Sequence, residues 1–178
     1  MSIYYGDGTN SGSGRLIKFT QNVLTSAATY DPGNDPGSDF STVISLSVTP
    51  TDSSTYHYIH WSICFSISSG TTMGTRLYAG NTAIVLGNAA GNRPRVTTAQ
   101  SVHQGEWWNI DTGMYRYDHN TSSQITYSLR TNTHDGRSLA VNRSASDSNS
   151  NYMDNARSCS FLNVMEFSGY WHNTIITL

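Results

Sequence analysis

The chain of 178 residues has little charge, and only one of its residues, Lys18, is a lysine. Charged residues make up 12% of the chain and the formal net charge is -2, whereas a typical soluble domain is about one quarter charged. Proteins that bind nucleic acids gather Lys and Arg on one face to neutralise phosphates. Because this sequence has no such basic field, we expect no nucleic-acid partner.

Cysteine and long apolar runs are also scarce. Cys64 and Cys159 are too few for a disulfide framework or a zinc site. Both lie in stretches of alternating apolar residues, which predicts buried free thiols and leaves a bridge between them open. No apolar run approaches the ~18 residues of a membrane span, and the first ten residues lack the regions of a secretory signal. We expect no membrane insertion, and we interpret the glycosylation sequons at Asn120 and Asn142 as chance matches.

Phosphate-binding motifs are missing despite a glycine-punctuated run. Gly87 and Gly91 suggest a phosphate loop, but that loop ends in Gly-Lys-Ser or Gly-Lys-Thr, and here Asn92-Arg93 follow. The residues fit a bend between two strands better. We predict a short strand over residues 82–86, a turn from Gly87 to Gly91, and a new strand that opens at Val96.

Catalytic and metal-binding patterns are lacking as well. His57 and His60 are three residues apart and would point to opposite faces of a strand, so they do not form a ligand pair. A polysaccharide hydrolase would need two carboxylates close together, and the nearest set is Glu106 with Asp111 or Asp118. We rank that hypothesis last and expect no catalytic residue, no metal site and no cofactor.

The dominant pattern is alternation with a period of two. One face of the segment 58–67 carries five apolar residues: Ile59, Trp61, Ile63, Phe65 and Ile67. The same period predicts strands over residues 43–48, 125–130, 139–142 and 161–167. Clusters rich in Gly, Pro, Asp and Ser separate the runs, at residues 31–37, 68–70, 134–136 and 144–151. Many short strands with polar turns predict an all-β fold, a single antiparallel β-sandwich domain of the jelly-roll kind.

The two ends of the chain differ from the middle. Residues 1–14 are rich in Gly, Ser and Asn with few apolar anchors. This composition predicts an N-terminal arm that is flexible or ordered only by a partner. The sandwich domain is expected over residues 15–178, in which the tail 168–178 forms an extra strand or a docking segment.

Four large aromatic residues gather in what we interpret as a loop-rich region: Trp107, Trp108, Tyr115 and Tyr117. Flat rings of this kind can stack on sugars while Asp, Asn and Arg neighbours hydrogen-bond the hydroxyl groups. The same residue types anchor protein interfaces. The cluster is therefore a candidate contact for a glycan or for another subunit, and capping of the core is the structural alternative.

Several blocks, in order along the chain, resemble β-sandwich virion proteins of marine and cyanobacterial tailed phages. Residues 77–93, LYAGNTAIVLGNAAGNR, resemble a strand of the type L-x-R-x-G-T-x-I followed by G-[DN]-A-A-G-x-R. Residues 41–51 are similar to the first core strand and its Thr-Pro-Thr turn, and residues 125–129, 139–144 and 161–167 to the closing segment. The chain departs from the pattern at Ala79 and Asn88, and in its tail.

The resemblance implies a structural protein of a tailed-phage virion, made in the host cytoplasm and displayed on the particle. It would be a tail fibre or tip component, or a capsid decoration protein of the knob or cement kind. Other virion proteins and further copies of the chain are the implied partners, with a trimer expected by analogy. The alternative is a carbohydrate-binding module that recognises host-surface glycans.

Overall fold

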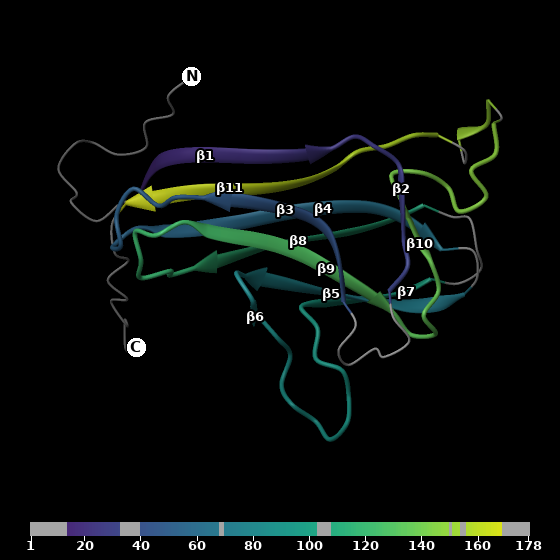
Figure 1. Ribbon diagram of the computed structural model, residues 1–178, viewed down its shortest axis with the longest axis horizontal. Coiled ribbons are helices and arrows are strands. Elements are labelled where there is room, and N and C mark those ends of the chain that lie inside the picture. Colours follow the sequence, from purple (N-terminus) through teal and green to yellow (C-terminus); the bar gives the residue numbers. More distant parts are fainter. Residues whose placement is uncertain are drawn as a thin grey trace, which may run out of the picture.

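The computed structural model describes residues 14–32, 40–67, 70–102, 108–149, 151–153 and 156–168. The regular elements within these ranges are strands: β1 Arg15–Leu24, β2 Ala28–Tyr30, β3 Ser41–Val48, β4 Tyr56–Ile67, β5 Thr71–Ala79, β6 Thr82–Ile84, β7 Thr98–Val102, β8 Asn109–Tyr117, β9 Ile125–Thr133, β10 Leu139–Val141 and β11 Ser160–Ser168. They form two antiparallel sheets that pack face to face (Figure 1), which confirms the expected β-sandwich. No helix in the described part of the chain has the length and hydrophobicity of a membrane span.

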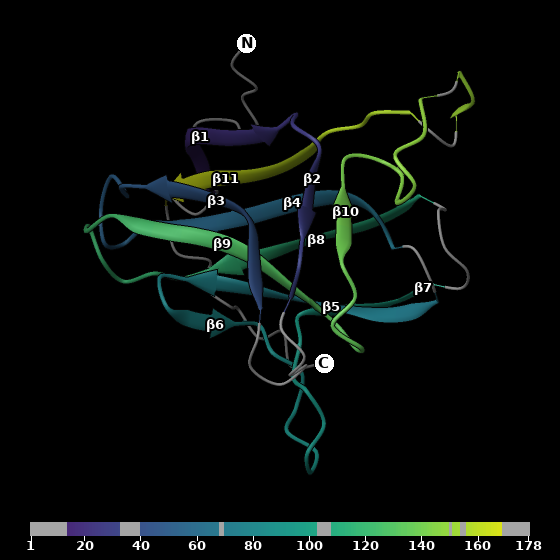
Figure 2. The ribbon, with the colours of Figure 1, turned by 45° about the vertical axis from the view of Figure 1, so that its right-hand side comes forward.

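Sheet A is built around β4. One edge of β4 pairs with β8, and the other edge pairs first with β11, over residues 56–62, and then with β10, over residues 65–67. The outermost row follows the same division, because β1 pairs with β11 and β2 with β10. In sheet B, β9 lies between β3 and β5, and β6 and β7 both pair with β5. Figure 2 shows β2 and β10 side by side at one end of the sandwich.

The core lies between the sheets, as the alternation in β4 predicts. The five odd-numbered apolar residues of β4, from Ile59 to Ile67, are buried. They face Met73, Leu77 and Leu129 of sheet B in one apolar cluster. His57 shares this inner face and is fully buried, whereas His60 is half-buried on the outer face. The expectation that the two histidines point to opposite faces is therefore confirmed.

Gly113 makes room for the largest core side chain. It lies opposite Trp61 in the pairing of β8 with β4, and a Cβ at this position would lie 2.3 Å from the Trp61 ring. Only glycine lets β8 pass beside a tryptophan that is 2% exposed. Gly74 plays the same part in sheet B, where a Cβ would lie 2.7 Å from a methyl group of Val96.

The glycine-punctuated run forms a projecting loop. The strand from Thr82 ends at Ile84, two residues earlier than predicted, because Val85 adopts a φ of 58° and leaves the extended conformation. The loop over residues 85–97 then extends away from the sandwich in both ribbon views (Figures 1 and 2), closed by a hydrogen bond from the Gly87 N–H to the Val96 carbonyl. The following strand, β7, begins at Thr98 rather than at Val96.

The structure differs from the expectations for three strands and for both cysteines. The aromatic region predicted as loop-rich contains the strand β8, and residues 15–24 and 71–79 are strands that the alternation did not mark. Both cysteines are free, but Cys64 is half-buried and Cys159 is exposed, so the prediction of buried thiols is wrong. Cys64 occupies an even position of β4, on the outer face, and Cys159 precedes the first residue of β11.

The expected N-terminal arm, apart from Gly14, and the expected tail, apart from Ser168, lie outside the described residues.

Asn142 lies at the junction between β10 and β11, which follow each other along one edge of β4 in sheet A. It is fully buried with a φ of 60°, so the chain leaves the sheet here and returns at Ser160. The Asn142 amide donates hydrogen bonds to the carbonyls of Leu24 (2.7 Å) and Ser26 (3.1 Å). Its oxygen accepts one from the Ser160 hydroxyl (2.7 Å), which in turn accepts one from the Cys64 N–H (3.0 Å).

Because this network is buried, Asn142 cannot act as a glycosylation acceptor in the folded chain, in agreement with the interpretation of its sequon as chance. Tethered at this point, residues 143–149, 151–153 and 156–159 form an excursion outside the sheet. It is held to Asn142 by a hydrogen bond from the Ser158 N–H to the Asn142 carbonyl.

We predict that Asn142→Ala lowers the free energy of unfolding by roughly 3–5 kcal/mol, because several buried groups lose their partners and alanine disfavours positive φ. Urea unfolding measures the change. Asn120→Ala is the matched control, since Asn120 also has a positive φ, 51°, but is exposed. Asn142→Gly, which tolerates the backbone angle without the amide, should remain clearly destabilised. Equal stability of the Asn142→Ala and Asn120→Ala proteins would contradict this account.

Candidate functional site

A buried polar cluster links the two sheets at the end of the core. The Glu166 carboxylate of β11 accepts hydrogen bonds from the Thr51 N–H (2.6 Å), the Thr51 hydroxyl (3.0 Å) and the Thr55 hydroxyl (2.7 Å). The Thr55 hydroxyl also lies 3.2 Å from Nε2 of His119. The His119 and His57 rings are 4.4 Å apart between centroids, and Nδ1 of His57 lies 2.8 Å from the hydroxyl of Tyr127 in sheet B.

The charge states of this cluster follow from its burial. Burial, together with the neighbouring His119, lowers the pKa of His57 to about 4. Burial also lowers the pKa of His119. Burial disfavours the charged form of Glu166, but the hydrogen bonds from Thr51 and Thr55 outweigh it and hold the pKa of this carboxyl below its ordinary value. At neutral pH the cluster therefore holds one carboxylate and two neutral imidazoles.

This arrangement suits a structural role better than chemistry. His57, His119 and Glu166 are 0%, 8% and 1% exposed, so a substrate has no approach to them. Within the described ranges, no group of three or more His, Cys, Asp or Glu side chains is placed to hold a metal ion. Sequence reasoning missed this cluster because its members come from distant segments and match no local motif.

The predicted aromatic residues do not form a flat exposed platform in the described structure. Tyr115 and Tyr117 occupy odd positions of β8 and share the inner side of sheet A, where both are half-buried and pack against the core. Trp108 is half-buried just before β8, and Trp107 lies outside the described residues. The interpretation of this region as loops hid the alternation that turns both tyrosines inward.

The two described carboxylates that the hydrolase hypothesis considered, those of Asp111 and Asp118, each have a different partner. Asp111 is 1% exposed on the inner side of β8 and accepts a hydrogen bond from the Thr98 hydroxyl (3.0 Å). Asp118 is exposed after the end of β8 and pairs with Arg116 at 2.8 Å. Glu106 lies outside the described residues. The two described aspartates thus each serve a local structural contact.

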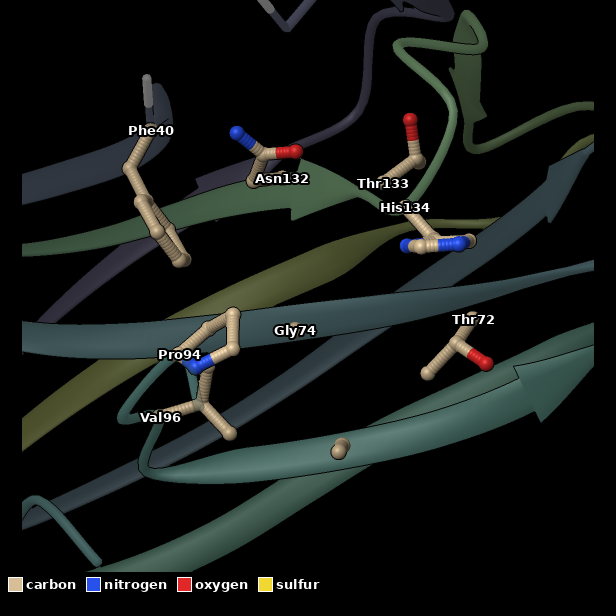
Figure 3. A pocket seen from close by; sticks show the side chains of 9 residues that line it. Phe40, Thr72, Gly74, Pro94, Val96, Asn132, Thr133 and His134 are labelled. Atoms are coloured by element: carbon tan, nitrogen blue, oxygen red, sulfur yellow. The ribbon is translucent and has the colours of Figure 1, made fainter. Parts of the chain in front are cut away.

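An open pocket of about 370 Å³ lies on the outer side of sheet B. Figure 3 shows Phe40 and Pro94 at one end of it, Thr72 and His134 at the other, and the strand at Gly74 between them. The lining is completed by four residues: Val96, Ala99, Asn132 and Thr133.

The pocket exists because the last residues of the projecting loop return to sheet B and pack over a glycine of β5. Gly74 leaves room for Val96, as described above, and a hydrogen bond from Nε of Arg76 to the Arg95 carbonyl (2.7 Å) holds the loop beside the sheet. The Arg76 guanidinium also lies 4.0 Å from the centre of the Phe40 ring. Apart from His134, the side chains that line the pocket are apolar or carry only hydroxyl and amide groups, so the pocket suits a small neutral ligand.

No protein-family model and no curated protein sequence matches the chain. Solved structures of infectious bursal disease virus are similar in backbone. The structure of its Gx strain has a TM-score of 0.48 and 14% identity, over 94% of this chain and 46% of that one. The structure of its T13 viral particle has a TM-score of 0.49 and 13% identity, over 94% of this chain and 43% of that one. The structure of its VP2 subviral particle has a TM-score of 0.43 and 10% identity, over 94% of this chain and 45% of that one. The chain therefore spans less than half the length of these structures, and β-sandwiches of such distant similarity serve many functions.

Acid should destabilise the fold through the buried histidines. The folded-state pKa of His57, about 4, lies below its ordinary value of 6.5, so the unfolded chain binds a proton first as the pH falls. The free energy of unfolding should therefore decrease from about pH 6.5 to about pH 4, by up to ~1.4 kcal/mol per pH unit for this histidine. His119 acts in the same direction. Glu166 contributes stability above its ordinary pKa of 4.5, and this is lost as the pH falls through its lowered pKa.

Urea unfolding followed across this pH range measures the effect. His57→Gln should reduce the slope, whereas His60→Gln, on the outer face, should keep it. If the stability of the His57→Gln protein depended on pH as steeply as that of the wild type, the buried histidine would not be the source.

Proposed function

We propose that the chain is a structural component of a tailed-phage virion, displayed on the particle as a tail fibre or tip protein or as a capsid decoration protein. On this proposal it is made in the host cytoplasm and ends in the virion. Its partners are other virion proteins and further copies of itself.

The observation that supports the proposal is where the phage-like blocks lie. Residues 41–51 include β3, and residues 77–93 cover the end of β5, β6 and part of the projecting loop. Residues 125–129 lie in β9, and residues 139–144 include β10. The strands β3, β9, β5 and β6 are successive neighbours in sheet B. The last block, residues 161–167, lies in β11, which shares an edge of β4 with β10. The resemblance therefore covers four successive strands of sheet B and the two strands that share one edge of β4 in sheet A.

The two ends of the described chain offer a place for attachment. Arg15 pairs with Ser168, so residues 1–14 and the tail 169–178 begin next to each other at one end of sheet A. We propose that these segments bind another virion protein.

Immunogold labelling of intact particles from the source phage, with antibody against this chain, tests the proposal. Label is expected on the particle surface, because a displayed sandwich leaves much of its area accessible. Label spread over the head would assign it to capsid decoration, and label at the tail would assign it to a fibre or tip.

Particles grown with a chain that lacks residues 1–14 provide the control for attachment. They should be unlabelled, while the truncated protein keeps the unfolding transition of the full chain. Absence of label on wild-type particles would overturn the virion proposal, and normal labelling with the truncated chain would overturn only the role of the arm.

A second candidate function is recognition of a host-surface glycan, favoured by the pocket on sheet B. Its volume is within the range of small-molecule sites. It combines the Phe40 ring with hydroxyl and amide groups at Thr72 and Asn132, the kinds of group that contact the faces and hydroxyls of sugars.

Titration with host-surface glycans distinguishes the pocket from the aromatic region before β8. If the pocket binds the sugar, Phe40→Ala should weaken binding at least ~10-fold, or ~1.4 kcal/mol, while Trp107→Ala leaves it unchanged. The reverse result would assign binding to the aromatic region. Absence of binding by the wild-type chain would reject this second function.

A further inference from the structure

The outer face of sheet A exposes several large apolar side chains, unlike the outer side of an ordinary antiparallel sheet. Five of its side chains are 43–63% exposed: Leu16, Phe19 and Val23 of β1, and Ile110 and Met114 of β8. Between these two edges lie half-buried side chains of the two central strands: Tyr58, His60, Phe161, Met165 and Phe167. We call these ten side chains the apolar face.

The strand register makes the apolar face continuous. Phe19 lies opposite Met165, which lies opposite Tyr58, and Val23 lies opposite Phe161. On the other side of β4, His60 lies opposite Met114. Directly opposite residues on one face of an antiparallel pair are ~5 Å apart, so these side chains form a connected patch. The same register places five polar side chains among them: Gln21, Asn163, Ser62, Thr112 and Arg116.

The outer side of sheet B shows the usual composition. Its central residues are polar, with Ser45 opposite Ser128, Ser47 opposite Thr126, and Thr42 opposite Arg130. Antiparallel sheets commonly bury one face and present such polar residues to water on the other. The contrast within one molecule indicates that the apolar face is covered when the protein is in its working state.

The scarcity of charged side chains around the apolar face indicates which kind of partner covers this face. Among the described residues, Arg116 is the one charged side chain that the register places beside the apolar face, on the same side of sheet A, and it is paired with Asp118. Arg15 and Lys18 are in register with Ser168 and Glu166, on the opposite side of the sheet. A nearly uncharged face gives no attraction to an acidic or basic partner, and two copies can meet on it without like-charge repulsion.

The size of the face also fits a second copy. Four strand rows at ~4.8 Å and about nine residues at ~3.3 Å give a plan area on the order of 600 Å². The accessible surface of projecting side chains exceeds the plan area, and a stable interface buries about 800 Å² on each partner. Six of the ten side chains of the apolar face are Phe, Tyr or Met, residues that interfaces favour.

We infer that two copies of this chain associate through the apolar face of sheet A, face to face about a twofold axis. A surface that meets itself gives a closed pair, in place of the threefold arrangement expected by analogy. The inference deepens the proposed function by naming the surface for self-association. It is tested on the purified chain and the virion role on particles, so either can fail without the other.

The methionines provide probes of the interface. Met114 and Met165 belong to the apolar face, Met73 is buried in the core, and Met153 is exposed on the excursion after Asn142. In the full chain labelled at its methionine methyl groups, the NMR signals of Met114 and Met165 should shift or broaden as protein concentration rises. Those of Met73 and Met153 should not change, and sedimentation should show the mass of a dimer.

A charged double variant then tests whether the face holds the pair together. Phe19→Asp with Met114→Glu changes two exposed side chains and should raise the dimer dissociation constant at least ~100-fold. The matched control, Ser45→Asp with Thr126→Glu, places the same two charges on exposed positions of sheet B and should leave the constant unchanged. Unfolding curves of both variants confirm that each is folded.

Three results would overturn the inference. The first is a wild-type monomer whose Met114 and Met165 signals do not depend on concentration. The second is a dimer that survives the charged double variant or shifts Met153 instead. The third is a monomer whose Met114 and Met165 signals change when residues 169–178 are removed, which would assign the face to the chain's own tail.

Discussion

The sandwich depends on a buried junction at which the chain leaves a sheet and later re-enters it in the same row. Strands β10 and β11 lie end to end along one edge of β4, although Asn142 and Ser160 are separated by a long excursion. An extended chain cannot turn out of a sheet without leaving carbonyl and N–H groups unpaired in the interior. The Asn142 amide and the Ser160 hydroxyl pair those groups, including the carbonyls of the neighbouring bend between β1 and β2.

Asparagine suits this position for two physical reasons. It tolerates a positive φ better than other residues with a side chain, and its amide both donates and accepts hydrogen bonds. Glycine would satisfy the first requirement and not the second. The start of the excursion that follows is thereby held in place. The Ser66 hydroxyl of β4 also donates a hydrogen bond to the Arg143 carbonyl there.

The opposite end of the core is held by Glu166 and the histidines. The carboxylate joins β11 to the turn between β3 and β4, while His57 and Tyr127 connect sheet A to sheet B. Between these two polar networks the sheets enclose the apolar cluster around Ile59, Phe65 and Leu129, beside buried polar side chains such as Thr75 and Asp111. A hydrophobic core favours collapse of the two sheets onto each other, and the buried hydrogen bonds of the polar networks favour one register among the alternatives. The same sandwich leaves one outer face polar and the other apolar, so the proposed functions rest on surfaces and not on a catalytic cleft.

The sequence by itself determined the fold class and the face of β4 that is buried, because alternation reports directly on which side of a strand is apolar. It also placed β3 and β9, where apolar and polar residues alternate, and β10 and β11, which are short runs rich in apolar residues. It failed for β1, whose apolar residues are exposed on one side, and for β8, where Gly113 and the aromatic residues obscured the period. Tertiary structure alone decided that His57, His119 and Glu166 meet, that Val96 packs over Gly74 to form a pocket, and that apolar residues of four strands join on one outer face. Each of these features joins residues far apart in the chain, and the register between strands that brings them together is set by packing and buried hydrogen bonds, not by any local pattern.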